Sequence, residues 1–364
     1  MKKKLILVWF CFLVVPALVF AENAKLLPGR VGRIYAVPAF AFVKAGFDRD
    51  GEYQKYADEG GALWALNLGF AAEYGILDWL TAALQWAPGW TFRSDVDAAV
   101  DKVNVNGLAD IFAGMKLQLI GEGAPLKTGR FRLALAPGVK IPLPGPNFKE
   151  EAQKVAAGKA VSAGNQDKHV LGAGGRGYFD CIFNEYFFIN LYGEFIYYPM
   201  RGKLENSGLD GYEIAAGINT LNNSIKLQDP SLGNAIKSGG VHYGYDLAFE
   251  VEPVFTLPLA KGVSFTAGLP FNYKLTPGKR YHLTVNHTGN SGLDTEIDLA
   301  AASIRAQLNE GSTSLLSLKP NASLFFTDLK LPMEFELCYS VPIWGKNEGA
   351  AHSLSFRAKL YFRI

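Results

Sequence analysis

The sequence predicts an all-β protein, an antiparallel transmembrane β-barrel of 12 strands with short periplasmic turns and long extracellular loops. Three observations predict it: apolar and polar residues alternate along many tracts, each tract is long for a soluble protein, and short connections alternate with long ones. Alternation of this kind places apolar side chains on one face of a strand, because successive side chains point to opposite sides. An alternative of 14 strands stays open, since Tyr281–Thr288 and Thr295–Ile304 alternate weakly within one long loop.

The first 21 residues predict a secretory signal peptide, and residues 22–364 are the predicted barrel domain. Lys2, Lys3 and Lys4 precede an apolar run, and Val19 and Ala21 occupy the small positions of a cleavage site. After residue 21 no apolar run approaches the length of about 20 residues that a transmembrane helix needs. We therefore expect export through the general secretory route and a location in the outer membrane of a diderm bacterium.

The chain ends on the clearest alternating tract, SLSFRAKLYFRI, Ser353 to Ile364. Its apolar residues share one parity, and Arg357, Lys359 and Arg363 share the other. In a membrane barrel the first set would face lipid and the second would face the lumen. A strand of this kind at the end of an outer-membrane protein is also the expected signal for the barrel-assembly machinery, so outer-membrane lipid and that machinery are the predicted partners.

Twelve such tracts, most of about 10 to 16 residues, are longer than the mean of about 5 to 6 for strands in globular proteins. Every second connection is brief, whereas the loops 144–167, 203–242 and 276–312 are long. Sorting of short turns and long loops to opposite ends is typical of outer-membrane barrels. The tracts cover 31–47, 62–74, 79–92, 107–120, 130–143, 168–183, 187–202, 243–257, 262–275, 313–327, 331–344 and 351–364.

The parity of the tracts places charged side chains of both signs inside the barrel. We expect these charges to pair across strands or to act together as a filter for solutes. Glu336 is expected opposite Lys359, and Asp110 and Lys116 are expected to face Arg132 and Lys140. The candidate lumen-lining residues are Asp110, Lys116, Arg130, Arg132, Lys140, Asp246, Glu250, Glu252, Glu334, Glu336, Arg357 and Lys359.

Three segments in order carry a resemblance to a known family: EYGILDWLTAALQW (73–86), GLADIFAGMKLQL (107–119) and RLALAPGVKIPLP (132–144). They resemble outer-membrane transporters of the phenol-degradation meta-pathway type, which are distantly similar to the long-chain fatty-acid (FadL-like) transporter group. The resemblance implies a barrel that moves hydrophobic compounds across the outer membrane. Only residues 22–30 separate the predicted leader from the first strand, far fewer than the N-terminal plug of that group.

The sequence offers little support for an enzyme or a cofactor. The five histidines lie mostly in or near predicted loops, without a recognisable catalytic spacing, so no catalytic residue, metal site or cofactor is expected. Cys181 and Cys338 are expected to be free thiols. The formal charge of +2 includes the three lysines of the leader, which leaves no basic surplus for a nucleic-acid partner.

One helix is expected, over Phe148–Ala163 in a predicted extracellular loop. The functional hypothesis is a transporter or channel for the uptake of small hydrophobic or aromatic molecules. Two alternatives stay open: a general diffusion porin for small hydrophilic solutes, and a non-conducting surface or adhesion barrel that works through its long loops.

Overall fold

The structure, a computed structural model, describes residues 23–55, 63–97, 102–105, 107–145, 147–157, 162–163, 168–228, 233–308 and 311–363. The predicted signal peptide lies outside the described residues. In the described part no helix is long and apolar enough to cross a membrane.

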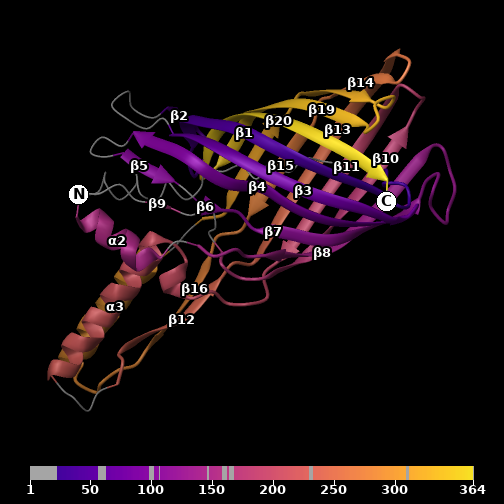
Figure 1. Ribbon diagram of the computed structural model, residues 1–364. Helices are drawn as coiled ribbons and strands as arrows, with labels where there is room; N and C mark the ends of the chain where they lie inside the picture. Colours follow the sequence, from indigo (N-terminus) through magenta and orange to yellow (C-terminus); the bar gives the residue numbers. More distant parts are fainter. Residues whose placement is uncertain are drawn as a thin grey trace.

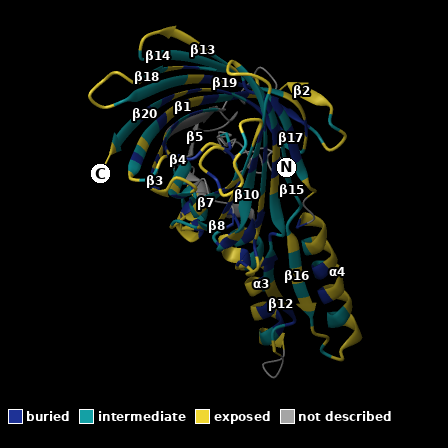
Figure 2. Cartoon of the chain, turned by 90° about the vertical axis from the view of Figure 1, so that its right-hand side faces the viewer, coloured by how far each residue is buried: buried dark blue, intermediate teal, exposed yellow. Residues whose placement is uncertain are grey.

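The described strands close into an antiparallel barrel (Figures 1 and 2). Closure comes from β1 and β20, which pair from Val31↔Arg363 to Phe47↔Glu348. With β14 and β15 counted as one interrupted strand, and β17 and β18 as another, the barrel has 12 strands, as predicted. In order around the wall these are β1 (Val31–Phe47), β3 (Leu63–Leu77), β4 (Leu80–Asp97), β7 (Ile111–Ile120), β8 (Phe131–Ile141), β10 (Gly172–Ile182), β11 (Phe187–Tyr197), β13 (Tyr245–Ala260), β14 (Val263–Gly268) with β15 (Phe271–Thr276), β17 (Thr313–Leu318) with β18 (Asn321–Phe326), β19 (Met333–Lys346) and β20 (Glu348–Arg363).

Two prolines account for the interrupted strands. Pro270 and Pro320 have no N–H to donate, so each breaks the regular ladder of its strand. The register does not shift across either break, because Gly268↔Asn321 and Phe271↔Leu318 belong to the same alignment. Lys319 N donates to Pro270 O at 2.9 Å and joins the two strands at this level.

Short turns and long loops lie at opposite ends of the barrel, as the sequence predicts. The end with the short turns, here called the turn end, also holds the C-terminus (Figure 1). The opposite loop end carries the short strands β2 (Tyr53–Lys55), β5 (Lys102–Val105), β6 (Gly107–Leu108) and β9 (Ser162–Ala163), and the helix α2 (Phe148–Ala156). Helix α2 confirms the first part of the predicted helix, and residues 158–161 of that prediction lie outside the described residues. Its last two residues are not helical, because Ser162–Ala163 form β9 beside β5.

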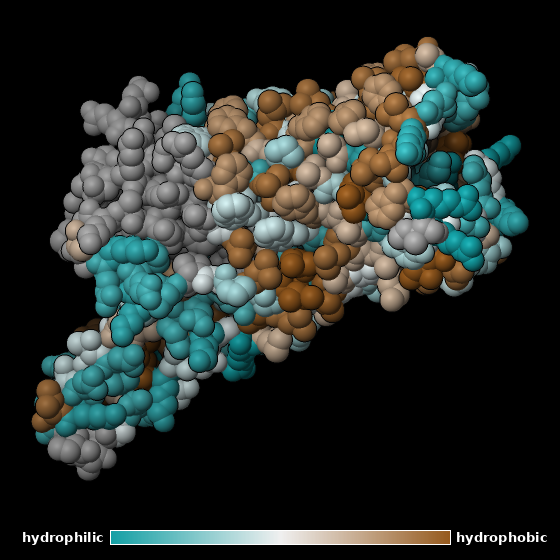
Figure 3. All heavy atoms as spheres, in the orientation of Figure 1, coloured by the Kyte–Doolittle hydropathy of each residue, from teal (hydrophilic) through white to brown (hydrophobic). Residues whose placement is uncertain are grey.

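Between the two ends the outer surface carries a broad apolar band (Figure 3). Phe40, Leu84, Phe249, Leu337 and Phe356 are among its exposed members, from five different strands. A soluble protein rarely exposes so large a continuous apolar surface, whereas a lipid-facing wall requires one.

The two longest loops together form a projection that the sequence analysis did not predict. We call it the appendage: η1 (Leu204–Asn206), α3 (Leu209–Gln228), β12 (Ile236–His242), β16 (Arg280–Val285) and α4 (Ser291–Gln307). It extends to one side from the loop end of the barrel (Figures 1 and 2). Strands β12 and β16 form a separate two-stranded sheet, which touches the chain after β11 through a bridge between Val241 and Gly202. The predicted strand near Tyr281–Thr288 therefore exists but adds nothing to the barrel.

Helix α4 shows why the expected strand over Thr295–Ile304 is wrong. Asn290 caps the helix, because its side chain accepts hydrogen bonds from Gly292 N and Leu293 N. Asp294 in the first turn accepts from the backbone N–H of Thr288, and this bond holds the pKa of Asp294 below its usual value. Ile297, Ala301 and Leu308 then lie on one buried helical face, at a spacing that overrides the weak alternation.

The same apolar cluster joins the appendage to the barrel. Ile218 and Ile225 of α3 and Val241 of β12 are buried in it together with Ile196 and Tyr198 at the loop end of β11. The appendage is therefore packed onto the barrel rather than held by flexible connections alone.

A charge placed on the lipid face tests the orientation of the wall. Phe356 lies near the middle of β20, and Ile343 lies close to the loop end of β19; both are exposed on the outer face. We expect Phe356→Arg to lower the free energy of unfolding by about 2–4 kcal/mol and Ile343→Arg by about 0–1 kcal/mol, since the cost of a cation falls away from the bilayer midplane. Urea unfolding in liposomes measures both, and equal effects would contradict this placement of the membrane.

Candidate functional site: the barrel interior

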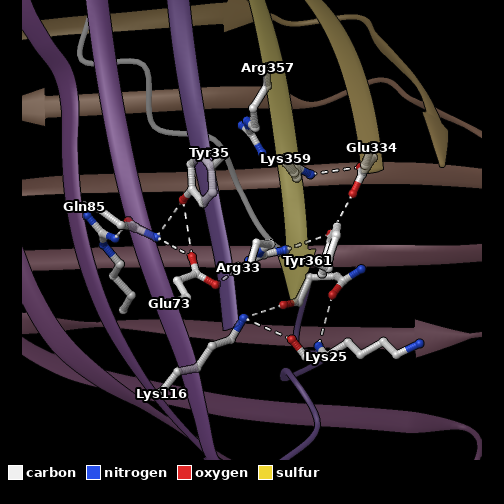
Figure 4. Close-up of polar contacts among 12 residues, drawn as sticks. Lys25, Arg33, Tyr35, Glu73, Gln85, Lys116, Glu334, Arg357, Lys359 and Tyr361 are labelled. Atoms are coloured by element: carbon white, nitrogen blue, oxygen red, sulfur yellow. Dashed lines mark hydrogen bonds and ion pairs between the residues drawn. The ribbon is translucent and has the colours of Figure 1, made fainter. Parts of the chain in front are cut away.

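The interior of the barrel carries a chain of polar contacts that begins on β1, β3 and β4. Arg33 Nη2 and Glu73 Oε2 form an ion pair at 2.5 Å. Gln85 Nε2 donates to Glu73 Oε1 and to the hydroxyl of Tyr35, each at 3.2 Å. Figure 4 shows these side chains pointing toward one another from three neighbouring strands. The carboxylate of Glu73 is almost fully buried. It is paired with the guanidinium of Arg33 on one side and accepts a hydrogen bond from Gln85 on the other, so both of its oxygens have partners.

Arg176 on β10 extends this chain across the lumen. Its Nη1 donates to Oε1 of Gln85, and its Nε forms an ion pair with Glu194 Oε2 at 2.6 Å. Strands β4 and β10 are not neighbours, because β7 and β8 lie between them in the wall. The guanidinium passes over Phe112 of β7, 3.8 Å from the ring centroid. The contact between Arg176 and Gln85 thus spans the interior instead of following the wall.

The chain continues on the other side of β1, through Tyr361. The hydroxyl of Tyr361 accepts from Arg33 Nη1 at 3.5 Å and donates to Glu334 Oε2 at 2.8 Å. Lys359 Nζ then contacts Glu334 Oε1 at 2.9 Å (Figure 4). We call the whole set the charge belt: Glu194, Arg176, Gln85, Glu73, Tyr35, Arg33, Tyr361, Glu334 and Lys359.

The pairing of β19 with β20 corrects one sequence prediction. Glu334 lies opposite Lys359 and Glu336 lies opposite Arg357, two residues away from the predicted register. The connection is tighter than expected, because β19 runs to Lys346 and β20 begins at Glu348. Lys359 Nζ still reaches Glu336 Oε2 at 3.1 Å along the diagonal, and Arg357 Nη1 lies 3.3 Å from the same oxygen.

The segment before β1 enters the lumen at the turn end. Ala24 is fully buried, and its N–H donates to both carboxylate oxygens of Asp180, at 3.1 and 3.2 Å. Lys116 Nζ donates to Asn23 O at 2.7 Å, and Gln118 Nε2 donates to Ala24 O at 3.1 Å. These contacts come from β7 and β10, so the segment is fixed inside the barrel and fills part of its cross-section.

A second polar cluster lies nearer the loop end, around Asp246 of β13. Its carboxylate accepts from Lys168 and from the hydroxyl of Tyr198, the latter at 2.6 Å. Lys140 Nζ lies 3.7 Å from Asp246 Oδ2 and 3.9 Å from Asp110 Oδ2. The predicted approach of Asp110 and Lys140 is therefore present.

The remaining predicted residues are dispersed. Glu250 and Glu252 are buried and accept from the side-chain amides of Asn272 and Asn321, each at 2.8 Å. The predicted approach of Lys116 to Arg132 is wrong, because Lys116 turns to the N-terminal segment.

Two arginines near the turn end have different surroundings. Arg132 Nη1 lies 3.5 Å from Asp180 Oδ2, and its Nη2 lies 3.6 Å from Glu122 Oε1. The predicted place of Arg130 in the lumen is wrong, because Arg130 precedes β8 and is exposed in the turn. Cys181 and Cys338, the cysteines of the described part of the chain, are free, as predicted. Among the described residues no three His, Cys, Asp or Glu side chains form a group suited to a metal ion.

The wall itself is interrupted between β4 and β7. Their pairing ends at Gln85↔Phe112 and resumes only with β6, at Trp90↔Leu108. Pro88 has no N–H, and Ala109 O accepts instead from Trp86 Nε1 at 2.8 Å. An indole therefore spans the gap in the ladder, beside the exposed ring of Phe70.

Sequence reasoning missed several residues of this interior. Arg33 and Tyr35 share the inward parity of Val37 and Ala39 on β1, so the alternation of that tract would have found them. Lys168 lies outside the strands, and nothing in its neighbourhood indicates the contact with Asp246. The N-terminal segment likewise shows no pattern that places it in the lumen.

No family model and no curated protein match the sequence. Among solved structures the chain is similar to the COG4313 outer membrane channel from Pseudomonas putida F1, with a TM-score of 0.57 and 12% identity over 94% of this chain and 100% of that one. Further matches include the NanC porin (TM-score 0.37, 6% identity, 91% and 100% covered) and a Pseudomonas aeruginosa FadL homologue (TM-score 0.34, 11% identity, 93% and 91% covered). The first match shows the fold of an outer-membrane barrel.

Removal of two carboxylates tests the pairing inside the barrel. The double variant Glu334→Gln/Glu336→Gln leaves Lys359 and Arg357 buried without their carboxylate partners. Breaking buried pairs in this way costs about 3–5 kcal/mol. We expect a loss of that order in urea unfolding, whereas Glu122→Gln, which removes an exposed partner of Arg132, should change stability by less than about 1 kcal/mol. Equal effects of the two changes would show that the interior pairs are as well solvated as the surface pair.

Proposed function

We propose that the protein takes up small hydrophobic or aromatic molecules across the outer membrane, and that these molecules reach the interior through the wall rather than along a water-filled lumen. The observation that carries the proposal is the contact of Arg176 with Gln85 across the interior. A general diffusion porin needs an open aqueous path, and this contact together with the N-terminal segment at Ala24 narrows that path at two levels.

The interruption between β4 and β7 supports the lateral route. A regular ladder offers no passage, because every backbone group is bonded to the next strand. Between the last ladder pair, Gln85↔Phe112, and the backbone bond from Ala109 N to Gly89 O, the ladder is replaced by the side-chain bond from Trp86, and rotation of that indole breaks this bond without loss of the strands on either side. The outer surface there is aromatic, with Phe70 and Trp90 exposed, and Phe112 lies on the inner side. Such a surface suits an apolar solute that is already dissolved in the bilayer.

In the proposed route the charged residues of the interior keep the lumen closed to ions. The charge belt holds the strands in register and excludes ions, so an apolar molecule that enters beside Trp86 meets Phe112 and the stem of Arg176 rather than open water. Asp110 and Lys140 lie on the loop side of this position, and their contact with the Asp246 cluster restricts the path toward the loops.

Two variants separate the lateral route from an aqueous pore. We expect Trp86→Ala to increase uptake of a fluorescent aromatic hydrocarbon into liposomes several-fold and to leave ion conductance low, because it opens only the wall. Arg176→Ala should raise the single-channel conductance and leave hydrocarbon uptake nearly unchanged, because it opens only the lumen.

Both measurements use the refolded protein from residue 22 to 364, with Trp344→Ala on β19 as the matched control for the loss of an exposed indole away from the gap. Large, steady conductance of the unsubstituted protein, with permeation of sugars, would contradict the proposal and indicate a porin. A barrel that neither conducts nor admits the hydrocarbon in any variant would also contradict it and would favour a surface or adhesion protein.

A further inference from the structure

The two-stranded sheet of the appendage has one face buried and one face open. Ile236 and Val241 of β12 are fully buried against the helices, and Leu283 of β16 packs on the same cluster. Because side chains alternate along a strand, the residues between them point the other way. Lys237 lies opposite Thr284, and His242 lies opposite Arg280, all on the open face.

The open face carries positive charge. Lys237, Arg280 and His282 are exposed, and the ring of His242 lies 5.8 Å from that of His282. The segments IKSGGVH and RYHLTV contain no Asp or Glu. Arg201 adds a further exposed cation at the edge, where its Nη1 donates to Gly239 O at 3.4 Å.

The opposite side of the appendage has the reverse balance. Exposed carboxylates lie on the helices, at Glu213 of α3 and at Glu296 and Asp298 of α4. Asp298 also engages the exposed ring of His287, at 3.0 Å from Nε2. The two faces therefore differ in net charge: the sheet carries cations and no acid, whereas on the helices acids outnumber the cations Lys226 and Arg305.

The position of the sheet brings its positively charged face close to the membrane surface. In Figure 1 the strands β12 and β16 lie on the side of α3 that faces the barrel, and the appendage extends beyond the barrel wall at the loop end. The apolar band of Figure 3 begins just below that level, toward the turn end. A sheet in this place overhangs the outer edge of the lipid-facing band, where the headgroups of the surrounding lipid lie.

We propose that the open face of the β12–β16 sheet docks on phosphate groups of outer-leaflet lipid. Lysine and arginine bind phosphate through charge-assisted hydrogen bonds. The contact fixes the direction of the appendage relative to the membrane plane. It is independent of the proposed transport function, since none of these residues contacts the interior described above.

Hydrogen exchange of the full chain tests this docking. The protein is reconstituted in nanodiscs of phosphatidylcholine that contain either a bisphosphorylated glucosamine-based lipid or the same lipid after enzymatic removal of its phosphates. We expect exchange over 236–242 and 280–285 to be several-fold slower with the phosphorylated lipid. The protection should disappear in Lys237→Gln/Arg280→Gln and persist in Lys226→Gln/Arg305→Gln, which removes the same charge from the helices.

Three outcomes would overturn the proposal. Equal exchange in the two lipids would show that the phosphate monoesters of the glucosamine-based lipid are not recognised, since both discs contain the phosphodiesters of phosphatidylcholine. Equal loss of protection in the two double variants would show that the total charge matters and the face does not. Protection by free inorganic phosphate in discs of phosphatidylcholine alone would assign the face to a soluble anion rather than to lipid.

Discussion

The closed ring of backbone hydrogen bonds is the constraint on which the rest of the structure depends. Lipid offers no hydrogen-bond partners, so a strand in the wall must be bonded on both sides, and the last strand must return to the first. Pairing of β1 with β20 meets this condition. Once the ring is closed, successive side chains of a strand point alternately to the lipid and to the lumen. Every charge on a strand in the middle of the wall must therefore lie inside.

Charges confined to a narrow interior have to neutralise one another. The interior does this largely with pairs between neighbouring strands, as at Glu334 and Lys359, where cross-strand distances suit salt bridges. Arg176 differs, because its partners lie on β11 and on β4, which do not adjoin each other. That contact joins side chains of two non-adjacent strands inside the barrel. The same physical need for charge balance thus stabilises the barrel and narrows it.

The structure deviates from the regular ladder where prolines occur. At Pro270 and Pro320 a backbone bond from Lys319 preserves the alignment, so the wall stays continuous in register. Near Pro88 the compensation comes from the side chain of Trp86, and a side chain can move without unfolding a strand. The backbone bond makes the break at Pro270 and Pro320 a structural irregularity, whereas the side-chain bond makes the break near Pro88 a candidate gate.

The alternation of apolar and polar residues by itself determined the barrel and which face of most strands turns inward, and the lengths of the connections determined the sorting of turns and loops. It left 12 or 14 strands open, because the weak alternation in one long loop belongs to segments outside the barrel. The prediction from alternation succeeded because alternation depends only on neighbouring residues, and because every strand of the wall has lipid on one of its two faces. The spacing within the strands did not determine the register of β19 against β20, since it depends on the exact length of the connection near Lys346.

Only the tertiary structure decided which charges meet across the lumen, where Ala24 lies, and that the longest loops fold into an appendage on the barrel. The contacts of Arg176 with Gln85 and of Ala24 with Asp180 join residues 91 and 156 positions apart. Helices α3 and α4 bury their apolar faces against β12, β16 and the barrel, and that shared surface exists only after the wall has closed. A local pattern cannot specify such contacts, because the partner that stabilises them is distant in sequence.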